Sequence, residues 1–230
     1  MVMSHLNRLK EILFGNRAVL TWSGGLDTTA LIPFVIEEFE MSVYPIFVNR
    51  HQENYEREKQ AISYYTQEFQ RRYARKFNSV IEVEIPIPPN EFRRLFPDSP
   101  IEKTHALRNS DIVNQAIRYG LLKDILLVLV GSNAGDTFAD NSASYWAKKT
   151  EEVREGTGIP NFRILPPFQE LRWNKKDVVL WCKSHSVEIQ HSWSCWYAAK
   201  RHCGKCTPCV RRKEAFKAAM VEDHTEYESP

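Results

Sequence analysis

Four of the five cysteines lie within 15 residues near the C-terminal end of the chain. Cys195, Cys203, Cys206 and Cys209 form the pattern C-x7-C-x2-C-x2-C. Two C-x-x-C units that share Cys206 can place four thiolates around one ion, and a closed set of four is typical of a structural, tetrahedral Zn²⁺ site. An iron–sulfur cluster uses similar short spacings and stays open as the alternative. A redox pair is less suited to the pattern, because it would leave two further thiols unexplained.

A second segment whose residue types could do chemistry follows the first apolar run. It reads Ser23-Gly24-Gly25-Leu26-Asp27-Thr28-Thr29. Two glycines let the main chain turn sharply and bring several N–H groups close to an anion, while hydroxyls and a helix N-terminus add donors and positive potential. This is the composition of a phosphate cradle. An ordinary strand-to-helix turn, with Asp27 or Thr28 as N-cap, is the alternative. The segment differs from a P-loop because no G-K-[ST] ending is present.

Strands and helices that alternate along the chain must position these residues. Apolar and β-branched runs predict strands at 17–22, 42–48, 79–85 and 125–131, and segments with helical spacing lie between them. This alternation predicts an α/β fold with a doubly wound parallel sheet. The lack of polar alternation in the last run is typical of a central strand that is covered on both faces.

The alternation of predicted strands and helices ends after about residue 155. We expect an α/β nucleotide-binding core over 1–155 and a small C-terminal helical, zinc-binding appendage over 156–222. In that appendage the stretch 156–168 is loop-like, and short helices are expected at 174–185 and 210–220. Residues 223–230 are polar enough to predict a disordered tail.

Composition narrows the class of protein. The 230 residues, 43% of them apolar and 26% charged, are typical of a globular domain, and a net charge of +2 argues against a dedicated nucleic-acid partner. The chain offers no apolar run of the ~20 residues that a membrane helix requires and no signal-peptide pattern, so we expect a cytoplasmic protein. Lysines and arginines around the cysteines, Arg211 and Arg212 among them, are expected to offset the charge of a zinc–thiolate centre. Cys182 is interpreted as a packed free thiol.

Several segments together resemble the 7-cyano-7-deazaguanine synthase (QueC) family, within the ATP-pyrophosphatase (PP-loop, HUP-like) superfamily, over roughly residues 18–216. The glycine-rich segment resembles S-G-G-x-D-[ST], Arg50-His51 resembles Q-R-H and Arg108-Asn109 resembles G-R-N. Residues 131–136 are similar to G-x-N-x-x-D, and residues 192–196 to T-W-S-C-Y.

The resemblance implies an ATP- and Mg²⁺-dependent carbon–nitrogen ligase. Such an enzyme adenylates the carboxylate of 7-carboxy-7-deazaguanine, ammonia gives the amide, and a second activation gives the nitrile. The nucleotide would be held by Thr21, Ser23, Gly24, Gly25, Leu26, Asp27, Thr28 and Gly131. The implied catalytic residues are Asp27, Arg50, His51 and Arg108, and the implied substrate contacts are Asn109, Asn133, Asp136 and Trp193. The family also implies a homodimer.

Two departures keep other functions open. Residues 137–144 contain neither Cys nor Arg, where the family carries a Y-S-G-Y-x-D-C-R-P-like stretch, and Leu107 replaces the family's glycine before R-N. Both lie on the acceptor side of the expected site, so a paralogue that conjugates the activated deazaguanine to an amine of a partner protein, as in antiphage defence, is a second hypothesis. A non-catalytic nucleotide-binding module is a third. A tRNA-thiolating enzyme fits less well, because Cys182 is the only thiol outside the zinc set.

Overall fold

A five-stranded parallel sheet forms the centre of the molecule in the computed structural model, which describes residues 2–13, 15–96 and 106–228. Its strands are β1 (Arg17–Thr21), β2 (Ser42–Asn49), β3 (Ile81–Glu84), β4 (Leu127–Leu129) and β5 (Arg163–Leu165), in the order β3-β2-β1-β4-β5. Every neighbouring pair is parallel. The predicted doubly wound α/β fold is confirmed.

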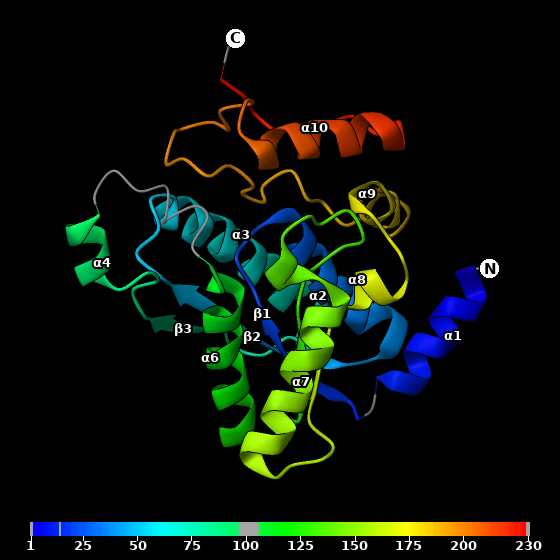
Figure 1. Cartoon of the computed structure of the whole chain (residues 1–230). Coiled ribbons are helices and arrows are strands. Elements are labelled where there is room, and N and C mark those ends of the chain that lie inside the picture. Colours follow the sequence, from blue (N-terminus) through cyan, green and yellow to red (C-terminus); the bar gives the residue numbers. More distant parts are fainter. Residues whose placement is uncertain (1, 14, 97–105, 229–230) are drawn as a thin grey trace.

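Helices cover both faces of this sheet (Figure 1). The alternation of β1 shows the division, because Ala18 and Leu20 pack into one core cluster and Val19 into the other. The first cluster is completed by residues of α2 (Leu26–Phe39), α3 (Tyr55–Tyr73), α9 (Lys175–Ser184) and α10 (Thr207–Ala219). The second is completed by residues of α6 (Arg108–Leu122) and α7 (Ala143–Thr157).

Four smaller elements were not anticipated from the sequence. They are α1 (Val2–Ile12), α4 (Asn90–Leu95), a 3-10 turn η1 (Ala139–Asn141) and α8 (Pro167–Glu170). The helix α7 was also missed. In Figure 1, α1 and α4 lie at opposite edges of the molecule, away from its centre.

Strand β5 departs from the expectation that residues 156–168 form a loop. It is only three residues long, follows Pro160-Asn161-Phe162 and is followed directly by Pro166, so its own sequence carries little strand signal. Its pairing with β4, with Val128 opposite Ile164, supplies the stabilisation. The expected appendage over 156–222 therefore includes the end of α7 and a strand of the central sheet.

The C-terminal tail also departs from the prediction of disorder, over the residues that the structure describes. Residues 223–228 run beside the cysteine segment, where His202 and Tyr227 form an isolated parallel bridge. Thr225 is buried and accepts a hydrogen bond from Arg212 Nε at 2.8 Å. The polar tail is ordered because its Thr225 hydroxyl accepts a hydrogen bond from the buried guanidinium of Arg212 on α10.

Among the described residues, no helix is both long and apolar enough to cross a membrane.

A cleft at the carboxyl ends of β1 and β4

The main functional candidate is a cleft of about 320 Å³ at the carboxyl ends of the central strands. The strand order reverses between β1 and β4, and ligands of open α/β sheets bind at such a switch point. Most of the expected site residues line this cleft: Thr21, Ser23, Gly25, Leu26, Asp27, Thr28, Arg50, Arg108, Asn109, Gly131, Asp136 and Trp193. Gly24, His51 and Asn133 are not among the lining residues.

The loop between β1 and α2 is shaped by Gly24 and by two hydroxyls. Gly24 has φ of +71°, and a Cβ there would lie 2.8 Å from the carbonyl oxygen of Glu58, so this position requires glycine. The hydroxyls of Ser23 and Thr28 are 3.2 Å apart, and the Gly25 N–H donates to Ser23 Oγ at 3.3 Å. The hydroxyl groups of Ser23 and Thr28 and the first turn of α2 thus surround one end of the cleft, which we call the phosphate end.

Gly131, just beyond β4, closes the phosphate end from the neighbouring strand. A Cβ at Gly131 would lie 2.6 Å from Thr28 Cγ2 and 3.0 Å from the Thr28 nitrogen. Only glycine allows this approach, and we include Gly131 in the phosphate end.

Asp27 lies in the first turn of α2 and forms an ion pair with Lys175. Lys175 is positioned by a capping box at the start of α9, in which the Asn174 side chain accepts the N–H groups of Lys176 and Asp177. The other carboxylate oxygen of Asp27, Oδ1, is buried without a hydrogen-bond partner among the described residues. A carboxylate oxygen in this state suits a hard cation such as Mg²⁺.

Asn133 and Asp136 shape the turn after β4. Asn133 is buried, and its Oδ1 accepts the Gly135 N–H at 2.9 Å, a hydrogen bond that shapes the turn. Asp136 Oδ2 accepts the Asn133 N–H at 3.0 Å and also an N–H of Asn141. Burial, and then the negative charge of Asp27, raise the pKa of Asp136 to about 6.

The cleft is also lined by a group of charged residues that sequence reasoning identified only in part. Arg50 follows β2 and Arg108 begins α6, and both line the cleft together with Glu58 of α3. Burial lowers the pKa of Arg108, while Asp140 and Glu58 favour its charged form. Burial raises the pKa of Glu58, and Arg50 is the largest influence in the opposite direction. We call Arg50, Glu58, Arg108 and Trp193 the acceptor end.

Glu58 was not predicted, although the sequence held one signal for it. It lies four residues before Ile62 and seven before Tyr65, on the apolar stripe that α3 buries. A carboxylate on a buried, apolar helix face indicates either a functional site or a structural ion pair.

Two of the expected residues have other contacts. His51 Nε2 pairs with Glu84 Oε1 at 2.7 Å at the end of β3, and His51 does not line the cleft, so its predicted catalytic role has no support from its position. Asn109 lines the cleft; its N–H donates to Asp140 Oδ2 at 3.2 Å and its Oδ1 accepts from Arg108 at 3.4 Å.

Trp193 connects the acceptor end to the phosphate end. Its main-chain N–H donates to the Gly24 carbonyl at 2.9 Å, and its ring packs on His202 with centroids 4.2 Å apart. The guanidinium of Arg57 lies 5.7 Å from the ring centroid. The Trp193 indole N–H is buried without an acceptor among the described residues. This donor is available to a ligand in the cleft.

The four predicted metal ligands come together. One ligand atom from each of Cys195, Cys203, Cys206 and Cys209 lies within 4.8 Å of all the others, with Sγ–Sγ distances of 4.0 Å for Cys203–Cys209 and 3.9 Å for Cys206–Cys195. Zn–S bonds of about 2.3 Å in a tetrahedron place sulfurs about 3.8 Å apart. The cluster therefore has the dimensions for one metal ion. Cys182 is buried elsewhere, as predicted, and burial raises the pKa of its thiol.

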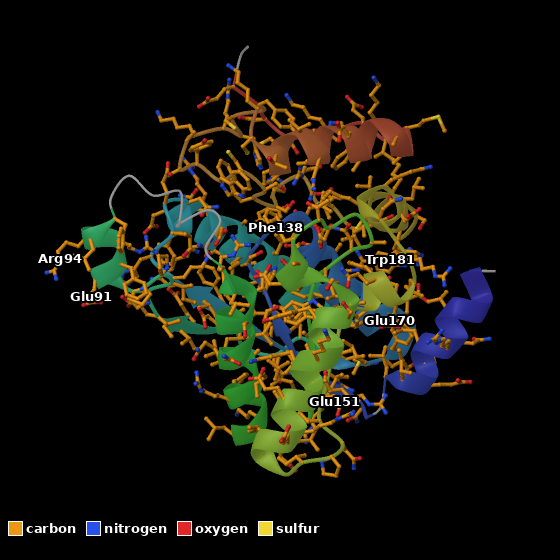
Figure 2. The ribbon with its side chains drawn as sticks, in the orientation of Figure 1. Glu91, Arg94, Phe138, Glu151, Glu170 and Trp181 are labelled. Carbon is orange, nitrogen blue, oxygen red and sulfur yellow. The ribbon has the colours of Figure 1, made fainter. Side chains whose placement is uncertain are left out.

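Two arginines near the cysteines make specific hydrogen bonds, and their expected charge-balancing role stays a prediction. Arg212 is fully buried and donates to Ser192 Oγ at 2.7 Å, Ser194 Oγ at 3.1 Å and the Ile189 carbonyl at 2.8 Å, which fixes the segment on both sides of Trp193. Arg211 lines the cleft and donates to Thr137 Oγ1 at 2.8 Å. Phe138, labelled in Figure 2, follows Thr137 in the loop that lies beneath α10.

A solved structure shares this architecture. The U34-tRNA thiolase NcsA from Methanococcus maripaludis, with its [4Fe-4S] cluster, matches 99% of this chain and 81% of its own, with a TM-score of 0.50 and 13% identity. At that identity the likeness establishes the fold alone.

Sequence relatives are more specific. The 7-cyano-7-deazaguanine synthases of Picrophilus torridus and Methanosphaera stadtmanae are 28% and 27% identical to this chain. They align over 92% of it, and over 92% and 98% of their own lengths. The Rhizobium rhizogenes enzyme of the same name is 40% identical over 73 residues, which is 32% of this chain and 30% of that enzyme. A family model described as "Queuosine biosynthesis protein QueC" matches residues 17–220, so the chain belongs to the QueC family.

Proposed function

We propose that this protein uses ATP to activate the carboxylate of 7-carboxy-7-deazaguanine for attack by ammonia, and that the amide is dehydrated in a second activation to 7-cyano-7-deazaguanine. The relatives named as synthases of that nitrile support the product. The single observation that carries the proposal is the adjacency of the two ends of one cleft, since the Trp193 N–H at the acceptor end donates to Gly24 of the phosphate loop.

The phosphate end would bind the triphosphate. The hydroxyls of Ser23 and Thr28 and the N–H groups at the start of α2 would contact phosphate oxygens, while Asp27 would hold Mg²⁺ through its unpartnered oxygen. Magnesium would neutralise charge on the departing pyrophosphate. Lys175 would then offset the charge that develops on the phosphates.

The chemistry needs activation because oxide is a poor leaving group. An oxygen of the substrate carboxylate attacks the α-phosphorus, and pyrophosphate leaves. Ammonia then adds to the acyl carbon, loses a proton and expels AMP, which gives the amide. In the second round the amide oxygen is adenylated, and loss of AMP and of the amide protons gives the nitrile. The guanidinium groups of Arg50 and Arg108 would orient the carboxylate and stabilise the charge that develops on its oxygens.

The cysteine set would hold one structural Zn²⁺. Main-chain N–H groups surround the sulfurs, as from Cys206 to Cys203 Sγ at 3.3 Å and from Cys203 to Cys195 Sγ at 3.4 Å. The Cys195 carbonyl accepts from Asn54 Nδ2 at 2.9 Å, so the metal site would fix the acceptor end without contact with the substrate. Elemental analysis that finds about one zinc and no iron per chain supports this assignment; iron with acid-labile sulfide would replace it by a cluster.

The test of the proposed function is a product assay. The protein is incubated with ATP, MgCl₂, 7-carboxy-7-deazaguanine and ammonium, and the small molecules are followed by mass spectrometry. We expect the amide and then the nitrile, with ATP consumed. Absence of any product and of ATP consumption would favour a binding module instead.

A protein amine is a second candidate nucleophile, because the loop that differs from the family faces the cleft. Phe138 and Asn141 of this loop line it, and Arg211 of α10 reaches across to Thr137. In the same assay with a cell lysate, a mass increment on a protein in place of the nitrile would support conjugation.

A further inference from the structure

Glu58 is a buried carboxylate that faces the cleft and that the proposed chemistry does not use. It lies in the first turns of α3, is 8% exposed, and lines the cleft next to Arg50 and Arg108. Burial of an ionised carboxylate costs free energy unless donors surround it. Its place in the wall of the cleft makes its hydrogen-bond partners informative.

The carboxylate is held by two neutral donors, one on each oxygen. Gln52 Nε2 donates to Oε2 at 2.6 Å and Asn54 Nδ2 donates to Oε1 at 3.1 Å. An ionised carboxylate has about four acceptor directions, so these two hydrogen bonds fix its plane and leave acceptor capacity on both oxygens. Burial raises the pKa of the Glu58 carboxyl, and the charges of Arg50 and Arg108 and the two amide donors oppose that rise. Glu58 is thus oriented and able to accept two further hydrogen bonds.

Its position places it beside both ends of the cleft. The Glu58 carbonyl packs on Gly24, where a Cβ would lie only 2.8 Å away, and Gly24 also accepts the N–H of Trp193. Asn54, which holds the Glu58 carboxylate, also donates to the carbonyl of Cys195. The main chains of Glu58 and Trp193 are consequently neighbours of the phosphate loop, and both residues line the same cleft.

We propose that Glu58 is the specificity residue for the substrate ring, and that its carboxylate accepts two parallel hydrogen bonds from the N1–H and the 2-amino group of a guanine-type base. The inference rests on the proposed function and deepens it. A guanine-type edge presents two adjacent donors that match a carboxylate. An adenine ring presents one amino group next to the N1 acceptor, whose lone pair the carboxylate would repel. Glu58 would therefore also keep the base of ATP out of the acceptor end.

The test compares two ligands and two variants by calorimetry. The ligands are 7-carboxy-7-deazaguanine and its analogue without the 2-amino group, 7-carboxy-7-deazahypoxanthine. A hydrogen bond to a charged group contributes about 1.5–3 kcal/mol, so the wild-type protein should bind the analogue about 10- to 100-fold more weakly. In Glu58→Gln this ratio should fall below about threefold, while the affinity for ATP changes little. Glu56→Gln, an exposed neighbour on the same helix, is the matched control and should keep the wild-type ratio.

The comparison of ligands on the wild-type protein needs no variant, so it stands even if Glu58→Gln folds poorly. Equal affinity of the wild-type protein for both ligands would overturn the role of Glu58 and leave the proposed function intact. Wild-type protein that binds neither ligand would overturn the proposed function and this inference with it. An unchanged ratio in a Glu58→Gln protein with normal ATP affinity would assign the discrimination to another residue.

Discussion

The two ends of the cleft are built in different ways. The phosphate end consists of main-chain N–H groups, short hydroxyls and glycines, nearly all from six consecutive residues, with Gly131 as the one distant member. The acceptor end consists of large or charged side chains from the end of β2, from α3, from the start of α6 and from the segment before Cys195.

This difference determines which parts of the cleft tolerate single substitutions. A phosphate is recognised by geometry of the main chain, which tolerates few substitutions, as the close approaches at Gly24 and Gly131 show. A ring and a nucleophile are recognised by side chains, which can be exchanged one at a time. The departures from the family pattern, at Leu107 and over residues 137–144, lie on the side of the site where side chains would recognise the ring and the nucleophile.

The largest effect is expected at the phosphate end. Asp27→Asn removes the charge that pairs with Lys175 and the proposed magnesium ligand, and ATP turnover should fall by about 100-fold or more. Turnover is measured from pyrophosphate release. The control is Glu151→Gln on the exposed side of α7, which should keep wild-type turnover (Figure 2). A wild-type rate in Asp27→Asn would remove Asp27 from the chemistry.

The next effect should be confined to the acceptor end. Cys209→Ser removes one of the four candidate metal ligands and should loosen the segment that carries Trp193, so the affinity for 7-carboxy-7-deazaguanine should fall by about tenfold or more. The affinity for ATP should change by less than about threefold. Cys182→Ala, at a buried thiol outside the cluster, should keep the metal. An equal loss of both affinities would show that the two ends are not separable.

The different construction of the two ends of the cleft explains how much of the fold and of the site could be predicted from the sequence. The glycine-rich loop and the cysteine pattern are contiguous in sequence and specific, and they predicted the phosphate end and the candidate metal centre. The contacts of Arg212 with Ser192 and Thr225 depend on tertiary packing, so the ordered tail was missed. Strand β5 was missed because its pairing with β4, rather than its own three residues, stabilises it.

Between the two ends, Asp136 gives a stability effect that depends on pH. Its pKa is raised from 3.8 to about 6 in the folded protein, so its contribution to stability is present in full below pH 3.8 and is lost as the pH rises through 6. Two pKa units correspond to about 3 kcal/mol, and partial exposure reduces this to about 1–2 kcal/mol. Asp136→Asn should therefore gain about that much unfolding free energy over wild type between pH 4 and pH 8. Parallel pH profiles in denaturant titrations would contradict the assignment.

The smallest effect concerns the entry to α6 at the acceptor end. Leu107 is exposed and has φ of +62°, a conformation that glycine adopts without strain. Leu107→Gly should raise the free energy of unfolding by about 0.5–1 kcal/mol, as measured by denaturant titration. Leu107→Ala, which keeps the strain, should show no such gain. A destabilised glycine variant would mean that the leucine side chain has a contact of its own.

The central claim is that the cleft brings a carboxylate oxygen to the α-phosphorus of ATP. It is tested most directly by single-turnover reaction with 7-carboxy-7-deazaguanine labelled with ¹⁸O in the carboxylate, in the presence of ammonium. Formation of the amide should transfer one ¹⁸O atom to AMP, detected by mass spectrometry as a mass increase of about two units. AMP that carries no label, while the amide is formed, would contradict the account.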